Sequence, residues 1–104
     1  MTFAEQLALM PTTIDHLSAI ELLDGETVIA RIDNRPGQAG SVRLYHALYQ
    51  EFGAISDIAA QKGLRLYAEH TADAQSFPGK HPNIDRLLLI ADSGQPLAIR
   101  LIAA

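Results

Sequence analysis

The sequence predicts an α+β fold, in which helices cover one face of a mostly antiparallel β-sheet. Short runs of alternating apolar and polar residues indicate strands, and glycine-containing turns between neighbouring runs indicate two hairpins. Apolar residues at helical spacing between Leu44 and Phe52 indicate a helix long enough to cover part of a sheet. We therefore expect a two-layer sandwich with about five strands, made of two hairpins and one further strand.

The first expected element is a short helix over residues 3–9. Thr2 and Glu5 have the spacing of a capping box, in which each side chain binds the backbone N–H of the other residue. We expect Pro11 to end this helix, because proline has no N–H group for the helical hydrogen bond. The helix would pack on the core or across a dimer interface.

A β-hairpin is expected next. Its two runs, residues 17–23 and 27–32, are joined by Asp24-Gly25-Glu26. Asp-Gly between two alternating runs is among the strongest short-range hairpin signals. Alternate residues of each run would face a buried layer on one side and solvent on the other.

Two helices and a strand are expected after the hairpin. Ser41 is a plausible N-cap for a helix over residues 42–52. A second helix over residues 54–62 would end at Gly63, a residue suited to the left-handed C-terminal cap. Alternation then predicts a strand over residues 64–69.

The last third of the chain is expected to contain a helix, a loop and the second hairpin. The helix would cover residues 71–77, and Pro82 favours an irregular loop over residues 80–85. Residues 86–91 and 97–102 would form the hairpin, although the first of these runs is also compatible with a buried helix.

Composition and charge bound the class of protein. A chain of 104 residues with 48% hydrophobic residues is expected to form a single domain, residues 1–104. Its net charge is −4, and its eight Lys and Arg residues are scattered, so it lacks the basic stripe that nucleic-acid binding requires. The absence of cysteine excludes disulfides and thiolate zinc ligands.

The N-terminal segment does not resemble a secretory signal, and the sequence has no apolar run of membrane-spanning length. We therefore expect a cytoplasmic protein that does not bind membranes.

Three strings carry a family resemblance: GSVRLYHAL over residues 40–48, AEHTADA over residues 68–74 and PGKHPNIDRLL over residues 78–88. The sequence is similar to a small proteobacterial family known only as a domain of unknown function. The resemblance implies a stand-alone bacterial protein and supplies no activity, so no functional residue is transferred from it.

Reactive side chains are concentrated between Glu69 and Arg86, which makes this segment the candidate site. Because it lies between two predicted strands, a core scaffold would hold it in place. The candidate ligand-binding residues are His70, Asp73, Lys80, His81, Asn83, Asp85 and Arg86.

Metal binding and acid–base catalysis are two interpretations of this segment. His70, Asp73 and His81, with Glu69 or Asp85, are ligand types that zinc or manganese accepts, but their spacing matches no known motif, so we expect no metal and no cofactor. A small hydrolase could use His81 with Asp85, or His46 with an acid of the segment, as its dyad.

Anion binding is a third interpretation. The helix opened by Ser41 would present free backbone N–H groups, with Arg35, Arg43 or Lys80 as counter-charge. The preceding glycine-containing loop lacks the Gly-Lys-Ser/Thr ending of a Walker loop.

We favour a fourth interpretation, in which the segment is an ordered structural loop. The protein would then be a binding or structural module acting as a homodimer, with an unidentified protein or a small anion as a further partner, rather than an enzyme. One observation separates these interpretations. It is whether His70, Lys80, His81 and Asp85 converge on an open pocket or are used in local hydrogen bonds.

Overall fold

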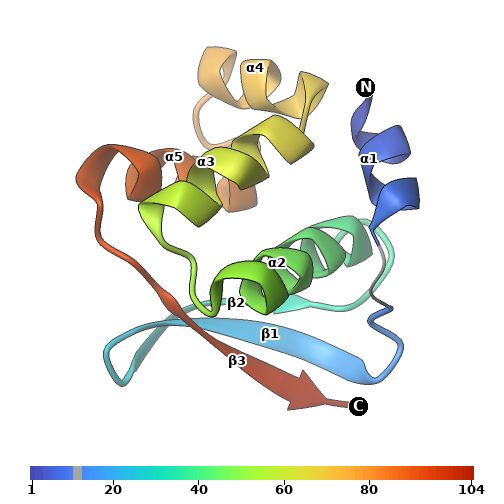
Figure 1. Cartoon of the computed structure of the whole chain (residues 1–104), viewed down its shortest axis with the longest axis vertical. Coiled ribbons are helices and arrows are strands. Elements are labelled where there is room, and N and C mark those ends of the chain that lie inside the picture. Colours follow the sequence, from blue (N-terminus) through green and yellow to red (C-terminus); the bar gives the residue numbers. More distant parts are fainter. Residues whose placement is uncertain (11–12) are drawn as a thin grey trace.

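The computed structural model describes residues 1–10 and 13–104, and Figure 1 shows a sheet with helices on one side of it. The α+β class and the placement of helices on one face are as predicted. The described residues form five helices and three strands. In chain order, they are α1 (Phe3–Leu9), β1 (Leu17–Asp24), β2 (Thr27–Asp33), α2 (Ala39–Phe52), α3 (Asp57–Leu66), α4 (Glu69–Ser76), α5 (Pro82–Ser93) and β3 (Ala98–Ala103).

The sheet has the strand order β2-β1-β3, and both neighbouring pairs are antiparallel. The β1–β2 hairpin is confirmed, and Gly25 at its turn has a φ of 61°, which glycine adopts without steric cost. Ile20 in β1 lies opposite Ile32 on one side and Leu101 on the other. This row is part of the buried face that the helices cover. The described residues contain three strands, so the prediction of about five is wrong.

The strand predicted over residues 64–69 is wrong, because α3 continues to Leu66 and α4 begins at Glu69. Gly63 lies inside α3 rather than at its C-terminal cap. A Cβ atom at Gly63 would lie 2.8 Å from a methyl carbon of Leu87 and 2.9 Å from one of Leu48. Glycine is therefore required here because α3 approaches α2 and α5 closely, and helix termination is not its role.

The strand predicted over residues 86–91 is also wrong, since α5 contains all of it, and the loop predicted over residues 80–85 is limited to residues 80 and 81, since α5 begins at Pro82. Pro82 occupies the first turn of α5, where a missing N–H is not needed by the helix. Ile84, Leu87 and Ile90 are buried at helical spacing. The buried helix considered as the alternative for residues 86–91 is therefore correct. The second hairpin does not form, because its first run is part of α5, and β3 pairs with β1 instead.

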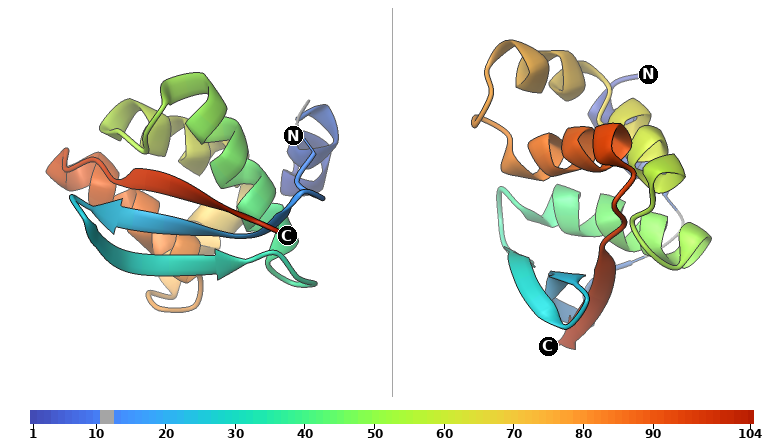
Figure 2. Two further views of the ribbon diagram at one scale, coloured as in Figure 1. Left: turned by 90° about the horizontal axis from the view of Figure 1, so that it is seen from below. Right: turned by 90° about the vertical axis from the view of Figure 1, so that its left-hand side faces the viewer.

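The helices form two tiers over the sheet rather than the single layer of a two-layer sandwich. Figure 2 (right) shows α2 next to the sheet, with α3, α4 and α5 beyond it. The sequence of α2 explains this arrangement, since its buried positions Val42, Leu44, Tyr45 and Leu48 point in more than one direction around the helix. A helix buried on two sides needs a partner on each.

The helix starts agree only partly with the sequence. The capping box of α1 is confirmed: Thr2 Oγ1 accepts a 3.2 Å hydrogen bond from Glu5 N, and Thr2 N donates to Glu5 Oε1 at 2.9 Å. Pro11, expected to end α1, lies outside the described residues. Ser41 is not an N-cap, because α2 begins two residues earlier, at Ala39. The cap of α3 is Ser56, so that helix starts later than predicted.

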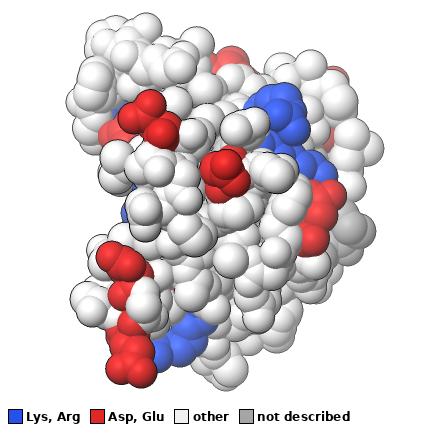
Figure 3. All heavy atoms as spheres, turned by 60° about the vertical axis from the view of Figure 1, so that its left-hand side comes forward, with Lys and Arg blue, Asp and Glu red and all other residues white. Residues whose placement is uncertain are grey.

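Charged side chains on the face shown in Figure 3 occur as small separate groups, with acidic and basic groups next to one another. Ion pairs at 2.7 Å join Lys62 to Glu51 and Arg100 to Glu21. Among the helices of residues 1–10 and 13–104, none has the length and apolar character needed to cross a membrane.

Candidate functional site

A pocket of about 490 Å³ brings most of the candidate residues together. It lies where the first turns of α2 and α5 meet α1, α4 and the end of α3. Figure 1 shows α1 and α4 on the same side of the molecule, and a contact between Phe3 and Glu69 joins them. The predicted residues that line the pocket are His70, Lys80, His81, Asn83, Arg86 and Ser41.

Arg86 is the central cation of this pocket. It lies in the second turn of α5 and is half-buried. Its Nη1 donates hydrogen bonds to Tyr45 Oη at 3.1 Å and to Asn83 Oδ1 at 3.0 Å. Within the described part of the chain, no carboxylate lies at ion-pair distance from this guanidinium. Both of its acceptors are neutral, so Arg86 keeps an uncompensated positive charge in the pocket.

Tyr45 holds Arg86 in place, and sequence reasoning assigned it only to the core. Its side chain is fully buried, and its Oη donates a hydrogen bond to the carbonyl of Asn83. Burial raises the pKa of Tyr45 to about 12, while the nearby charge of Arg86 acts in the opposite direction. Tyr45 therefore stays protonated, donating to Asn83 and accepting from Arg86. A tyrosine at a core position of a helix gives no local signal of this role.

Ser41 contributes donors from the first turn of α2. Its Oγ accepts a 2.7 Å hydrogen bond from the hydroxyl of Tyr67, whose pKa is raised by burial. The Ser41 hydroxyl proton is therefore available to another acceptor. In residues 1–10 and 13–104, the backbone N–H groups of Ser41 and Asn83 make no hydrogen bond. These two groups belong to the N-terminal turns of α2 and α5, where the helix dipole favours negative charge.

Asp73 organises one side of the pocket. Its Oδ2 lies 2.6 Å from His81 Nε2 and 2.9 Å from Lys80 Nζ. The hydrogen bond from His81, followed by that from Lys80, holds the pKa of Asp73 below its usual value. Asp73 is thus ionised at neutral pH and neutralises the charge of Lys80.

The His81–Asp85 dyad expected from sequence does not form, because the partner of His81 is Asp73. Asp85 instead accepts a 2.9 Å hydrogen bond from the backbone N–H of Gly79, which shapes the turn before α5. The sequence left open whether four side chains converge on an open pocket or make local hydrogen bonds. Three of them, His70, Lys80 and His81, line the pocket, whereas Asp85 makes a local hydrogen bond.

Three aromatic rings form another wall of the pocket. Phe3 stacks on Tyr67 with ring centroids 5.1 Å apart. The rings of Phe3 and His70 pack edge to face, with centroids 5.4 Å apart. Glu69 does not line the pocket but accepts a 2.8 Å hydrogen bond from Phe3 N, which anchors α1. Ala68, between Tyr67 and Glu69, has a φ of 54°, a conformation that is strained for a residue with a side chain.

The other predicted anion-binding residues lie elsewhere. Arg35 pairs with Asp33 at 3.5 Å, and Arg43 Nη2 donates to the carbonyl of Met10 at 2.8 Å. Arg31 of β2 does line the pocket, which the sequence did not predict, and it pairs with Asp33 at 2.9 Å. No group of three or more His, Asp or Glu side chains in the described segments is placed to hold a metal ion.

His46 does not join the segment as the alternative dyad would require. Its ring lies 5.7 Å from that of His16, centroid to centroid, and its Nε2 is 3.5 Å from the Gln50 side-chain nitrogen. His46 is therefore a core residue of α2 with no acidic partner among the described residues.

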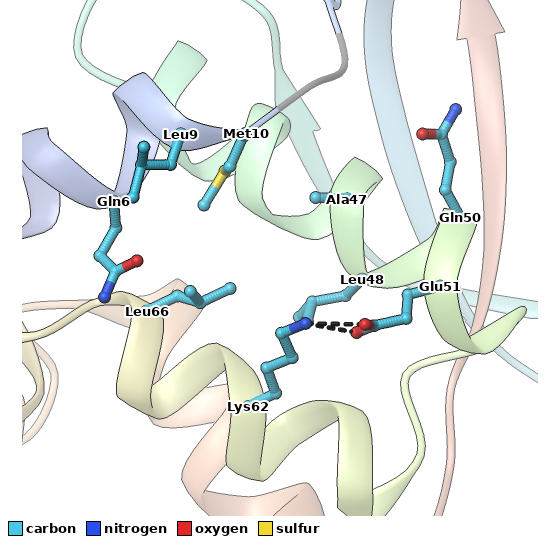
Figure 4. A pocket seen from close by; sticks show the side chains of 9 residues that line it. All are labelled: Gln6, Leu9, Met10, Ala47, Leu48, Gln50, Glu51, Lys62 and Leu66. Carbon is cyan, nitrogen blue, oxygen red and sulfur yellow. Dashed lines mark hydrogen bonds and ion pairs between the residues drawn. The ribbon is translucent and has the colours of Figure 1, made fainter.

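A second pocket, of about 380 Å³, lies between α1, α2 and α3 (Figure 4). Leu9, Met10, Leu48 and Leu66 give it a mainly apolar lining. Its charged residues, Glu51 and Lys62, pair with each other, as the dashed lines in Figure 4 mark. This pocket therefore offers a ligand no uncompensated charge.

Residues 3–101 match the model of a family described as "Uncharacterized protein conserved in bacteria (DUF2322)". The matched range includes the three strings on which the resemblance was based. No curated protein and no solved structure matches the chain.

Proposed function

The chain belongs to this family of uncharacterised bacterial proteins, and on that premise we propose that it is a binding module whose pocket holds a small anionic ligand. The ligand would sit between the first turns of α2 and α5, against Arg86. Binding, rather than catalysis, is the activity that the arrangement of donors supports best.

The uncompensated charge of Arg86 carries this proposal. Placing a charged group away from water is unfavourable unless it is paired, and the two acceptors of Arg86 are neutral. The planar guanidinium can offer two parallel N–H donors to a phosphate or carboxylate. An anion in the pocket would supply the missing partner.

Further donors around Arg86 support the same conclusion. The N–H groups of Ser41 and Asn83 and the hydroxyl of Ser41 are available to the ligand, as described above. Lys80 and Arg31 also line the pocket, but each is paired with carboxylates: Lys80 with Asp73, and Arg31 with Asp33 and Glu21. Of the side chains that the structure describes here, Arg86 thus supplies the unpaired positive charge. The pocket therefore favours an acceptor-rich, negatively charged group.

The test is a calorimetric titration of inorganic phosphate and of sulfate into wild type and Arg86→Gln at low ionic strength. We expect Arg86→Gln to weaken binding about tenfold or more, because a hydrogen bond to a charged group contributes roughly 1.5–3 kcal/mol. Arg100→Gln is the matched control, since Arg100 is paired with Glu21 outside the pocket.

Equal affinities for Arg86→Gln and Arg100→Gln would contradict the proposal, as would the absence of binding to wild type. Circular dichroism of each variant shows whether the fold is retained, so that a loss of binding is not confused with unfolding.

A small hydrolase is the second candidate, and the His81–Asp73 contact favours it. An aspartate bound to Nε2 would leave Nδ1 of His81 as the free nitrogen, which is the arrangement of a general base. Lys80 contacts the same Asp73 oxygen, so Asp73 would stabilise the protonated form of His81 less strongly. We therefore rank binding above hydrolysis. Release of phosphate from an added phosphate ester would reverse that order.

We also propose that the protein forms a homodimer through β2. This strand is an edge of the sheet, and its side chains Val28 and Ile29 are 41% and 52% exposed. An open edge strand with exposed apolar side chains favours pairing with another strand.

A further inference from the structure

We infer that the ligand is an organic phosphate monoester whose ring or apolar group packs against Phe3. This inference rests on the proposed anion-binding function and adds the chemical class of the ligand. It follows from the size of the pocket, from its aromatic wall and from the number of available donors.

The pocket is much larger than an inorganic anion. Its volume of about 490 Å³ lies in the range typical of sites for organic small molecules, roughly 300–1,000 Å³. One water molecule takes about 30 Å³ of the liquid, so a phosphate ion with five heavy atoms fills only a minor part of this space. The remaining volume can hold an organic group attached to the phosphate.

The remaining volume is bounded by aromatic side chains. Phe3, Tyr67 and His70 all line the pocket, and Phe3 contacts the other two rings. Tyr67 is buried, whereas Phe3 is partly exposed. Phe3 and His70, which is also partly exposed, are therefore the rings with surface free to contact a ligand, and Phe3 is the purely apolar one of the two. Aromatic pairs favour ring centroids about 4.5–7 Å apart.

Tyr67 links the polar end of the pocket to the aromatic wall. Its hydroxyl binds Ser41, while its ring stacks on Phe3. The Ser41 donor and the Phe3 ring thus both contact the same side chain, that of Tyr67. A ligand whose ring lies one or two bonds from its anionic group, such as an aryl phosphate, is suited to contact both.

The donors suit a phosphate better than a carboxylate. Arg86, the Ser41 hydroxyl and the N–H groups of Ser41 and Asn83 exceed the number of acceptors that two carboxylate oxygens supply with good geometry. A phosphate monoester has three terminal oxygens and a charge of about −1.5 to −2 at neutral pH. The positive side chains lining the pocket are therefore better matched by the phosphate.

The experiment compares phenyl phosphate, inorganic phosphate and benzoate by titration calorimetry on wild type, Arg86→Gln, Phe3→Leu and Leu9→Ala. We expect wild type to bind phenyl phosphate about 3- to 10-fold more tightly than inorganic phosphate, because of the added aromatic contact. Benzoate should bind more weakly than phenyl phosphate. Phe3→Leu keeps an apolar residue for packing α1 and should remove most of the preference for the ester.

Leu9→Ala is the matched control, since Leu9 is on the same helix but does not line this pocket, and it should leave the preference unchanged. Equal affinity of wild type for phenyl phosphate and inorganic phosphate would overturn the inference while leaving the proposed function intact. So would tighter binding of benzoate. If none of the three anions binds in an Arg86-dependent way, the proposed function itself fails and the inference fails with it.

Discussion

The hydrogen bonds of individual residues set the positions and the charge of the groups that line the pocket. Tyr45 and Tyr67 use their hydroxyl groups to position Asn83, Arg86 and Ser41. Asp73 pairs with Lys80 and is hydrogen-bonded to His81. Arg86 has neutral acceptors only. This one imbalance distinguishes the pocket from an ordinary surface hollow.

His46 gives a prediction for stability against pH. It is only 2% exposed, its Nδ1 has no partner among the described residues, and burial, followed by the nearby His16, lowers its pKa. The folded-state pKa therefore lies below the unfolded value near 6.5, and the unfolded chain binds the extra proton between the two values. Well above pH 6.5, neither state binds this proton, so the titration of His46 does not change the free energy of unfolding. As the pH drops below about 6.5, the free energy of unfolding falls.

We expect the urea-unfolding free energy of wild type to decrease between pH 7.5 and pH 5.5, by at most about 1.4 kcal/mol per pH unit for one proton. The control is His46→Gln, which cannot take up that proton and should show a smaller decrease over the same interval. Equal decreases in the two proteins would show that the buried imidazole does not cause the effect.

The packing of α3 against α2 and α5 depends, at the scale of elements, on the absence of a side chain at Gly63. Gly63→Ala would place a Cβ atom less than 3 Å from methyl groups of Leu87 and Leu48, both of which are fully buried and have little room to move. We expect a loss of about 1–2 kcal/mol in the free energy of unfolding, although alanine is the better helix former by about 1 kcal/mol.

Chemical denaturation of Gly63→Ala and of Gln61→Ala measures this effect. Gln61 is exposed on the same helix, so its replacement should change stability by less than about 0.5 kcal/mol. A Gly63→Ala protein as stable as wild type would mean that α3 can shift away from α5 at little cost.

The proposed dimer is a prediction at the scale of the whole molecule. In the part of the chain that the structure describes, β2 and β3 are the edge strands of the sheet, and β2 has the exposed apolar side chains. We expect sedimentation velocity to give twice the monomer mass for wild type. Ile29→Lys should shift the protein to monomer, because a charge on an edge strand opposes pairing.

Gln61→Lys serves as the control, since it introduces the same charge at an exposed position of α3, outside the sheet. A dimer that is unaffected by Ile29→Lys would place the interface elsewhere. A wild-type monomer at all concentrations would contradict the dimer proposal.

The candidate site is also a property of the whole molecule. The pocket joins Phe3, Arg31, Ser41 and Tyr67 to residues 80–84 and Arg86, so it forms only when five separate parts of the chain meet. The sequence identified residues 69–86 because reactive side-chain types are dense there. It did not identify Tyr45 or Arg31, because a tyrosine on an apolar helix face and an arginine in a strand have ordinary structural explanations.

The sequence by itself determined the features that depend on neighbouring residues. The capping box of Thr2 and Glu5 and the hairpin turn at Gly25 are set by local backbone preferences, so they were predicted correctly. The tertiary structure decided the rest. Residues 86–91 are apolar in a pattern compatible with both strand and helix, and contact with α3 makes them a helix. Likewise, Asp73 rather than Asp85 meets His81 because α4 and α5 fold back on each other, an encounter that spacing along the chain does not specify.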